Sequence, residues 1–390
     1  MRKSRLPAGG ANVFQLIRDK RAEAEAEGRK LLDLSIGEPK GAALASARRA
    51  ASAAVLSEDE AMHAYQYNAS PAVPDFARRF VRAHLADDPG DVSYLPIPGI
   101  KPVLGLLPLA CGCAADALDV TTTAPGYPIP ANWCAYHPKV THHAITLNTE
   151  GAFRFKPGDI PKGTGLLMIN YPHNPSGQIA SAEWFREICH YCADNDIRLF
   201  NDAAYVALSH DDESTTLTAV AGGFPDLSWA EAFTAAKLIG NGTGWHVGAM
   251  VGSADFIDDM SEVKGKTDAG FVAPMAAGVI ATLEDDQAGI DGFRALYRER
   301  LNILQRLMIN AGMRLAITPR AGFFTLWETP SNAFGEPISS AAEFNFMMIE
   351  RTGVVGVHFG NFMGYAVCAD IKSIETALAD AFQAADPAYD

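Results

Sequence analysis

One lysine of this 390-residue chain lies in a setting that favours covalent chemistry. Lys237 ends the run Ala-Phe-Thr-Ala-Ala-Lys, and five glycines follow it at positions 240, 242, 244, 248 and 252. Apolar surroundings disfavour the charged form of a lysine, and a neutral amine is a nucleophile toward a carbonyl group. The glycines allow the backbone to approach a bound group closely. This stretch therefore predicts a lysine that reacts with a carbonyl compound.

Other polar residues stand where predicted strands end. Asn170 and Asp202 each close an apolar run, and Thr234 closes the run that precedes Lys237. If these runs are parallel strands, their carboxyl ends lie at one edge of the sheet, where ligands of such sheets bind. We therefore expect Asn170, Asp202 and Thr234 to line one site.

Pyridoxal 5'-phosphate (PLP) is a cofactor that matches this set of residues. It needs a lysine for its aldehyde and an acid beside its pyridine nitrogen, so that the protonated ring withdraws electrons. We predict that Lys237 forms the Schiff base and serves as the base that moves a proton, and that Asp202 faces the ring nitrogen. Both are predicted catalytic residues, together with Tyr205.

The other predicted cofactor contacts surround the ring and the phosphate. Tyr205 and Asn174 are expected to donate to the phenolic oxygen, and Tyr127 to stack on the ring. The phosphate is expected to meet the start of a helix, whose N–H groups favour anions. We assign to it Gly99, Ile100, Lys101 and the hydroxyl of Thr234.

The pattern of elements predicts an α/β fold with a mostly parallel sheet. Apolar strands are expected over 117–123, 165–170, 197–202, 228–234 and 247–252, and a helix over 182–194. A long helix over 283–312 is expected to join two domains, with further strands at 313–327, 353–359 and 364–368. We predict an N-terminal arm with part of a small domain (1–45), a large cofactor domain (46–282) and a small C-terminal α+β domain (283–390).

Composition narrows the class of protein. The chain is 48% hydrophobic and 20% charged, with a formal net charge of -14, so we expect a globular protein and no nucleic-acid partner. Cys111, Cys113, Cys189 and Cys192 form two close pairs, but no second ligand pair stands at metal-site spacing, so no metal is expected. No apolar run is long enough for a membrane span, and the basic start (Arg2, Lys3, Arg5) is not that of a signal peptide. The predicted location is the cytoplasm.

At these residues the chain resembles the PLP-dependent aminotransferases of fold type I, class I and II. Asn170-Tyr-Pro-His-Asn-Pro-Ser-Gly177 is similar to the Asn-Pro signature of that family, and Asp202-Ala-Ala-Tyr205 to its Asp-x-x-Tyr. Lys237 follows Asp202 by 35 residues, as in the family. The stretches 34–39 and 320–327 resemble its terminal signatures. The likeness is greatest to the branch near LL-diaminopimelate and aspartate-type aminotransferases.

The resemblance carries further implications. Family members act on amino acids, which are small-molecule substrates, as homodimers that share each active site. Tyr65 resembles the tyrosine that reaches the phosphate in the partner subunit. Gly37 and Asn174 resemble residues that contact substrate.

Two family arginines are missing from this chain. The arginine that holds the phosphate is replaced by His246, nine residues after Lys237, which we keep as a cofactor contact because a histidine can bind a phosphate when protonated. The arginine that binds a substrate carboxylate corresponds to Gly364, or to Val367 if the strand is shifted. His358, Lys372 and Arg320 are candidate replacements.

These losses leave alternatives open. Transamination is the commonest reaction of the family, but the missing carboxylate arginine also suits elimination, replacement, cyclisation or carbon–carbon bond formation in specialised metabolism. A PLP-binding sensor domain and a cofactor-free homologue are two further hypotheses. The glycines after Lys237 do not match a dinucleotide fingerprint, and the Gly265-Lys-Thr stretch lacks the first glycine of a phosphate-binding loop.

Overall fold

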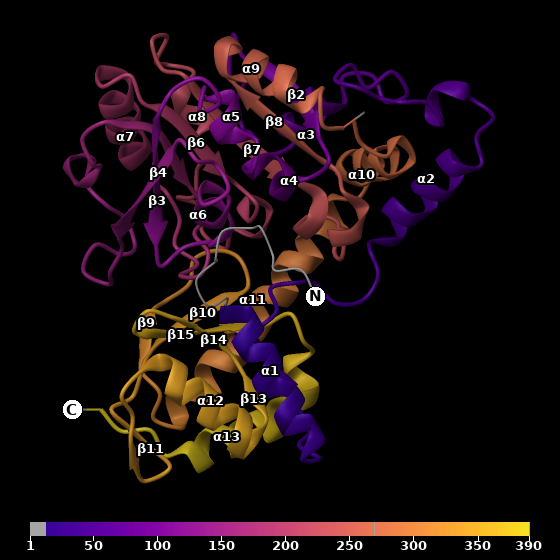
Figure 1. Cartoon of the computed structure of the whole chain (residues 1–390). Coiled ribbons are helices and arrows are strands. Elements are labelled where there is room, and N and C mark those ends of the chain that lie inside the picture. The colour runs from indigo at the N-terminus through magenta and orange to yellow at the C-terminus, as the bar shows by residue number, and fades with distance from the viewer. Residues whose placement is uncertain (1–12, 269, 390) are drawn as a thin grey trace, which may run out of the picture. The chain divides into compact units, whose positions relative to one another are not determined.

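The computed structural model describes residues 13–268 and 270–389, which divide into two compact units (Figure 1). The larger unit comprises residues 41–173 and 179–294. The smaller unit comprises the described residues up to 40, the short segment 174–178 and those from 295 onward. The predicted domain boundaries at 45 and 282 stay predictions. The basic start at Arg2, Lys3 and Arg5 lies outside the described residues.

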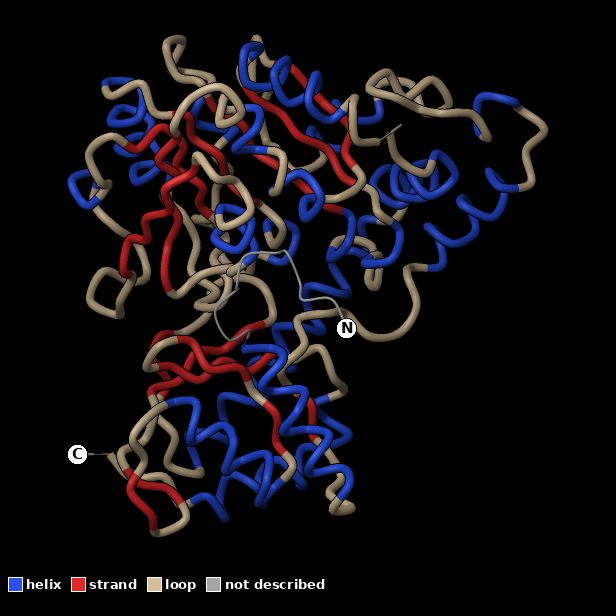
Figure 2. Tube along the Cα trace, viewed as in Figure 1, coloured by secondary structure: helices blue, strands red, loops and turns tan. Residues whose placement is uncertain are grey.

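A seven-stranded sheet forms the centre of the larger unit (Figure 2). Its order is β2-β8-β7-β6-β5-β3-β4. The strands are β2 (Ser93–Ile97), β3 (Leu118–Ala124), β4 (Val140–Thr146), β5 (Thr164–Ile169), β6 (Arg198–Asp202), β7 (Trp229–Thr234) and β8 (Gly248–Gly252). β8 runs antiparallel to both β2 and β7, whereas the β3–β7 pairs are parallel. The predicted α/β fold with a mostly parallel sheet is confirmed.

Burial explains why these segments are strands. The last four residues of β5, from Leu166 to Ile169, are all buried, so both faces of the strand are covered. All residues of β8 are buried as well. Continuous apolar runs of this kind are typical of strands covered on both sides. The Asn170 and Asp202 side chains, where β5 and β6 end, are also buried, so both need polar partners.

Helices surround this sheet or, like α2 and α10, which pack on each other, extend the larger unit beyond it (Figure 1). They are α2 (Ala45–Val55), α3 (Phe76–Arg82), α4 (Ile100–Leu104), α5 (Leu107–Ala110), α6 (Ile129–Cys134), α7 (Ala182–Asp194), α8 (Thr218–Ala221), α9 (Ala254–Lys264), α10 (Ala273–Asp285) and the start of α11 (Gln287–Asn310). α7 has the predicted bounds, and Ser181 caps it by accepting from the Trp184 N–H at 3.2 Å. Residues of α4, α5 and α9 share one apolar core with β2, β3 and β5–β8.

The predicted helix over 283–312 is divided in the structure. α10 ends at Asp285 and α11 begins at Gln287, because the Asp286 carboxylate accepts from the Gly289 N–H at 3.0 Å and from the Ser46 hydroxyl at 2.5 Å. The strand β4 and the helix α9 were not predicted from the sequence.

The smaller unit is an α+β structure. It holds an antiparallel sheet in the order β14-β15-β10-β9 and a parallel pair of β1 with β13. Its elements are α1 (Val13–Ala26), β1 (Leu32–Asp33), the rest of α11, β9 (Leu315–Ile317), β10 (Phe324–Glu328), β11 (Asn332–Ala333), β12 (Glu336–Pro337), α12 (Ala341–Thr352), β13 (Val354–Val355), β14 (Val357–Phe359), β15 (Phe362–Ala366) and α13 (Glu375–Ala385).

The predicted single strand over 313–327 is wrong in its middle. The chain leaves the sheet between β9 and β10, where the N–H groups of Arg320 and Ala321 both donate to the Gly177 carbonyl at 2.9 Å. These two bonds also explain why the segment 174–178 belongs to the smaller unit.

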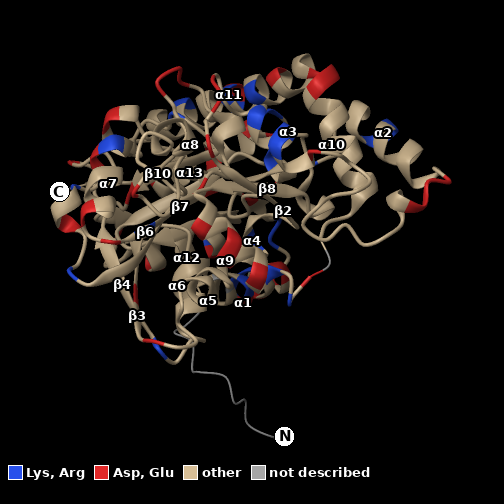
Figure 3. Ribbon diagram, turned by 90° about the horizontal axis from the view of Figure 1, so that it is seen from above, with Lys and Arg blue, Asp and Glu red and all other residues tan. Residues whose placement is uncertain are grey.

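Charged side chains are scattered over the helices and loops. Lys and Arg positions are interspersed with Asp and Glu positions and form no basic stripe in the view of Figure 3. Among the residues described, no helix combines the length and the apolar character needed to cross a membrane.

Candidate active site

A pocket opens in the larger unit where β3, β5 and β6 end. Its empty volume is about 300 Å³. The lining residues are Leu104, Thr122, Thr123, Tyr127, Pro130, Met168, Ile169, Asn170, Phe200 and Asp202. The structure therefore brings together three residues singled out in the sequence, Tyr127, Asn170 and Asp202, at the predicted edge of the sheet.

Asp202 is the charged group of this pocket. It is only 6% exposed, and one carboxylate oxygen accepts a hydrogen bond from the Ala204 N–H at 3.1 Å. Burial raises the pKa of Asp202 to about 7, while the Ala204 bond and the nearby charge of Lys237 oppose the rise. A carboxylate in such surroundings is well suited to a cationic ring N–H, because the pair would neutralise the buried charge.

Lys237 lies one turn beyond the end of β7. The side chain of Thr234 accepts from the Ala236 N–H at 3.2 Å and caps a short 3-10 turn over Ala235–Lys237. The Ala235 N–H is bonded to the Val247 carbonyl at 2.9 Å, which ties this turn to the start of β8. Lys237 is half-buried and interacts electrostatically with Asp202, so the structure places the predicted amine and the predicted acid in one region.

The predicted phosphate site lies at the start of α4. Gly99 precedes this helix with a φ of 83°, in the left-handed region that favours glycine. A side chain on Gly248 of β8 would stand 3.3 Å from the Gly99 Cα, so the glycine lets this loop approach the sheet. Ile100 is buried and Lys101 is exposed.

The two predicted tyrosines of the larger unit differ in burial. Tyr127 lines the pocket, and burial raises its pKa, with the charge of Asp202 acting in the same direction. Tyr205 is 8% exposed and stands just before a 3-10 turn over Val206–Leu208. Both residues follow the strand ends that form the pocket.

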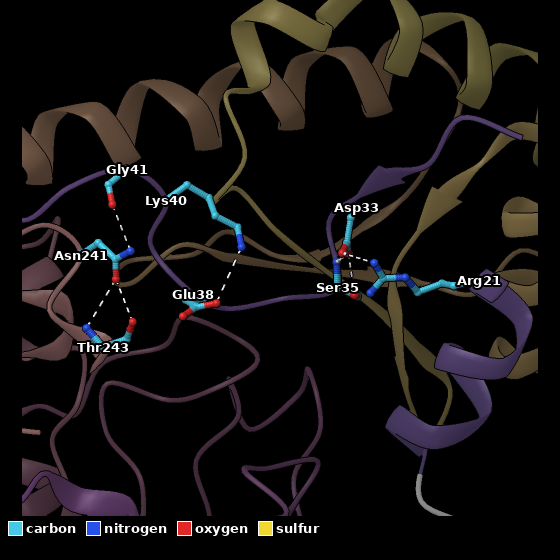
Figure 4. Close-up of polar contacts among 8 residues, drawn as sticks. All are labelled: Arg21, Asp33, Ser35, Glu38, Lys40, Gly41, Asn241 and Thr243. Atoms are coloured by element: carbon cyan, nitrogen blue, oxygen red, sulfur yellow. Dashed lines mark hydrogen bonds and ion pairs between the residues drawn. The ribbon is translucent and has the colours of Figure 1, made fainter. Parts of the chain in front are cut away.

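The side chain of Asn241 holds the glycine-rich loop that follows Lys237. The Asn241 amide donates to the Gly41 carbonyl at 3.1 Å, and its oxygen accepts from the Thr243 hydroxyl at 2.7 Å (Figure 4). His246 follows in the left-handed region, with a φ of 54°, and its side chain is exposed.

Tyr65 is also exposed, by 69%, on a loop of the larger unit. Its ring lies 5.7 Å from that of Tyr67. Its role at the phosphate of a partner subunit therefore stays a prediction.

The predicted substrate contacts belong to the smaller unit. Asn174 begins the segment 174–178, and Gly37 follows the strand β1. A side chain on Gly37 would collide with the ring of Phe324, so glycine is needed there. The neighbouring Lys40 and Glu38 form an ion pair of 3.7 Å (Figure 4). The substrate roles of Asn174 and Gly37 stay predictions.

The strand position of the missing carboxylate arginine is apolar. Val367 is fully buried, and a side chain on Gly364 would meet the Phe359 ring at 2.7 Å. His358, one candidate replacement, packs edge-on against Phe346 with 5.8 Å between ring centroids, and burial lowers its pKa. Lys372 lies at the surface, 4.0 Å from Glu299.

Sequence reasoning missed several polar residues around the pocket. Thr122 and Thr123 line it, and their place at the end of a strand was a signal that could have found them. Asn201 and Glu231 are fully buried within β6 and β7, and their polar side chains in apolar runs were a second signal. In the described ranges, no group of three or more His, Cys, Asp and Glu side chains is arranged to hold a metal ion.

The residues present fit PLP. The pocket offers a buried acid for a ring nitrogen, an aromatic wall and a nearby lysine, which are the groups that this cofactor needs. Lys237, Asp202 and Tyr127 would hold the aldehyde carbon, the pyridine nitrogen and the ring face.

Comparison with known proteins agrees with this chemistry. A family model described as aminotransferase class I and II matches residues 29–364. The LL-diaminopimelate aminotransferase of Syntrophobacter fumaroxidans is 27% identical over 410 residues, covering 94% of each chain. The enzyme of that name from Desulforudis audaxviator is 27% identical, covering 90% of this chain and 88% of its own.

Solved structures share the fold. Substrate-bound BacF from Bacillus subtilis has a TM-score of 0.83 at 18% identity, covering 98% of this chain and 97% of its own. A probable N-succinyldiaminopimelate aminotransferase from Thermus thermophilus has a TM-score of 0.81 at 23% identity, covering 96% of this chain and 100% of its own.

These findings confirm the predicted family, its fold type I architecture and the branch near LL-diaminopimelate aminotransferases. The family model spans most of the chain, from the segment before β1 to β15. The chain belongs to the class I and II aminotransferases, which are PLP-dependent enzymes of the transferase class.

Proposed function

We propose that Lys237 and Asp202 are the central residues of this aminotransferase and that its substrate is a small molecule, an amino acid. When bound, PLP supplies an electron-withdrawing ring that makes the Cα–H bond of an attached amino acid acidic. The Nζ atom of Lys237 would accept that proton and deliver it to the carbon that carried the cofactor's aldehyde, as an amino-group transfer requires. The Asp202 carboxylate keeps the ring nitrogen protonated, and Tyr205 and Asn174 donate to the phenolic oxygen.

The remaining predicted residues bind and orient. Tyr127 covers the ring face from the wall of the pocket. The phosphate is held by the N–H groups at the start of α4, by the Thr234 hydroxyl and by His246. These partners fix the cofactor, so that the proton moves at a defined atom. Gly37 and Asn174 meet the substrate.

One observation carries this proposal. The Asp202 carboxylate is buried beside the pocket, and its pKa, raised to about 7 by burial, is held down in part by the charge of Lys237. A buried acid with a strongly shifted pKa beside a lysine is typical of a reactive site. The carboxylate needs a cationic partner, and a protonated pyridine ring supplies one.

We also propose a homodimer with shared active sites. Tyr65 and Tyr67 are 69% and 61% exposed, and Val55, Leu56 and Val272 are exposed apolar residues of the same unit. Apolar side chains that adjoin one another at the surface are typical of an interface, and the rings of Tyr65 and Tyr67 are 5.7 Å apart. A second copy of the chain is the proposed partner, with Tyr65 reaching its phosphate. A location in the cytoplasm and the lack of a nucleic-acid partner stay predictions.

The identity of the amino acid is the open part of the proposal. Relatives are named for LL-diaminopimelate, and structural neighbours for aspartate and N-succinyldiaminopimelate, so these are the first substrates to test. The apolar position of the missing arginine, at Gly364 and Val367, favours a different partner for the substrate carboxylate. The alternative of a non-transaminating reaction is not favoured, because the named relatives are aminotransferases.

A two-part experiment tests the proposal. Purified protein is loaded with PLP, and its visible absorption is followed as single amino acids are added without a keto acid. Conversion of the cofactor to pyridoxamine phosphate by at least one donor is expected, and Lys237→Ala should abolish it. Lys266→Ala, which changes a lysine 74% exposed, is the matched control. A wild-type protein that takes up no PLP, or holds it but converts it with no donor, contradicts the proposal.

A further inference from the structure

His173 is a buried group that the proposed chemistry does not use. It lies in the turn after β5 and is 1% exposed. Its Nε2 atom is 3.1 Å from the main-chain carbonyl of Pro125. A carbonyl oxygen only accepts hydrogen bonds, so Nε2 must carry the proton. Burial lowers the pKa of His173 to about 4, which keeps the ring neutral at the pH of the cell.

Aromatic packing fixes the orientation of this imidazole. Its centroid is 6.2 Å from that of Phe153 and 5.5 Å from that of Tyr171. The Tyr171 hydroxyl donates to the Phe153 carbonyl at 2.5 Å, and Tyr171 also packs on Trp184 with 4.7 Å between centroids. The His173 ring therefore has little freedom to turn away from Pro125.

The turn that carries His173 is anchored to the sheet by a buried polar chain. The Asn201 side chain on β6 accepts from the Tyr171 N–H at 2.9 Å and donates to the Tyr171 carbonyl at 3.0 Å. The Asn201 amide also donates to Glu231 of β7 at 2.7 Å. Glu231 accepts further bonds from the Leu217 N–H and from the N–H and hydroxyl of Thr218. Because the Glu231 carboxylate accepts all of these hydrogen bonds, the network fixes the turn against β6 and β7.

Pro125, the acceptor of the His173 hydrogen bond, lies in the loop between two residues that line the pocket. Pro125 stands between Thr123, which lines the pocket at the end of β3, and Tyr127, which lines it from the following loop. A side chain on Gly126 would collide with the Thr123 carbonyl, so the loop turns tightly here. The bond thus joins the Tyr127 loop to the ends of β5 and β6, where Asn170 and Asp202 line the same pocket.

We propose that His173 is a positioning residue that holds the Tyr127 loop at a fixed separation from Asp202 and so sets the width of the cofactor slot. It touches neither cofactor nor substrate and acts through Pro125. This inference rests on the proposed function for its effect on PLP. Its effect on the loop itself does not depend on any cofactor.

Three substitutions test the role of the N–H donor. His173→Gln places an amide N–H near the position of Nε2, whereas His173→Asn is too short and His173→Leu has no donor. His84→Leu is the matched control. His84 is a second histidine whose pKa burial lowers to about 4, and it is bonded to the Phe80 carbonyl at 2.9 Å, but it does not line the pocket.

The first readout uses no cofactor. Hydrogen exchange of the amides over 122–130 in the PLP-free protein should become faster in His173→Asn and His173→Leu, and remain near wild type in His173→Gln and His84→Leu. The second readout is PLP affinity, which should weaken about tenfold in the Asn and Leu variants and recover in the Gln variant.

Two results would overturn the proposal. One is unchanged exchange over 122–130 in both the Asn and Leu variants. The other is an equal loss of PLP affinity in His84→Leu, because a general loss of stability would then explain the effect. A wild-type protein that binds no PLP removes the proposed function, but the exchange measurement still decides whether His173 holds the loop. If the Leu variant does not fold, the comparison of Gln with Asn gives the same answer.

Discussion

The Asn170 side chain donates a hydrogen bond to the main-chain carbonyl of Asp202 over 2.7 Å. This bond ties the end of β5 to the end of β6 at the point where both strands reach the pocket. The Asp202 carboxylate is held separately by the Ala204 N–H. Backbone and side chain of Asp202 are therefore both fixed before any cofactor arrives, which is the preorganisation that a reactive site needs.

The burial of Asp202 predicts a pH dependence of stability in the PLP-free protein. Its pKa is about 7 when folded and near 3.8 when unfolded, so between these values the folded protein holds a proton that the unfolded chain has lost. Asp202 therefore lowers the free energy of unfolding as the pH rises through this window. At about pH 8, Asp202→Asn should be more stable than wild type by up to about 4 kcal/mol, and at about pH 4 the two should be similar.

Urea unfolding at several pH values measures this difference. Asp194→Asn, which changes an exposed carboxylate at the end of α7, is the control and should keep the wild-type pH dependence. Addition of PLP should stabilise wild type more than Asp202→Asn, because only the carboxylate offsets the charge of the ring. A stability difference between wild type and Asp202→Asn that shrinks as the pH rises would contradict the assignment.

The sequence was sufficient to predict where the polar residues at the strand ends lie. Asp202 and Asn170 close apolar runs, and a run of that kind has few alternatives to a buried strand, so their position followed from the pattern. Lys237 was found because lysine is rare among small apolar residues. Contacts between residues that are distant in the sequence could not be predicted in this way. The hydrogen bond between Asn201 and Glu231 is one example. Each residue lies in a run whose pattern predicts a strand but does not identify the partner of its side chain.

Other features depend on contacts between distant segments. The break in the predicted strand over 313–327 arises because Arg320 and Ala321 bind the carbonyl of Gly177, about 140 residues away in the chain. His246 was predicted to contact the phosphate because of its position in a family motif. The structure places it in a left-handed turn with its side chain exposed. Its role therefore needs an experiment.

Gly248→Ala should weaken PLP binding as well as stability. The new methyl group would stand 3.3 Å from the Gly99 Cα and collide with the Phe233 carbonyl, so the loop before α4 has to move away from β8. Overpacking of this kind costs about 1–3 kcal/mol of stability. The moved loop carries the predicted phosphate donors. Equilibrium titration with PLP and urea unfolding measure both effects.

Gly158→Ala is the control for that substitution. No atom lies within 4 Å of the side chain it would add, so neither stability nor PLP affinity should change much. If Gly248→Ala loses stability but binds PLP as wild type does, the start of α4 does not hold the phosphate.

His246→Asn tests the histidine that replaces the family arginine. Asparagine tolerates the left-handed backbone at this position but carries no charge, so the substitution removes only the imidazole. PLP affinity should fall about threefold to tenfold, because the imidazole N–H that would meet the phosphate is lost. His190→Asn, which changes another exposed histidine, should have no such effect. Wild-type PLP affinity in His246→Asn would show that this imidazole does not hold the phosphate.

Tyr65 tests whether two copies of the chain share each site. Its ring is 69% exposed, and if it completes the phosphate site of a partner, Tyr65→Ala and Lys237→Ala should each be nearly inactive. When the two inactive variants are unfolded together, mixed in equal amounts and refolded, half of the dimers should be hybrids. In each hybrid one site holds both substitutions and the other holds neither, so activity should return to about a quarter of the wild-type value. Tyr136→Ala, which changes a tyrosine 47% exposed, is the control and should be active without mixing. If the mixture stays inactive although sedimentation shows dimers, Tyr65 acts within its own subunit or not at all.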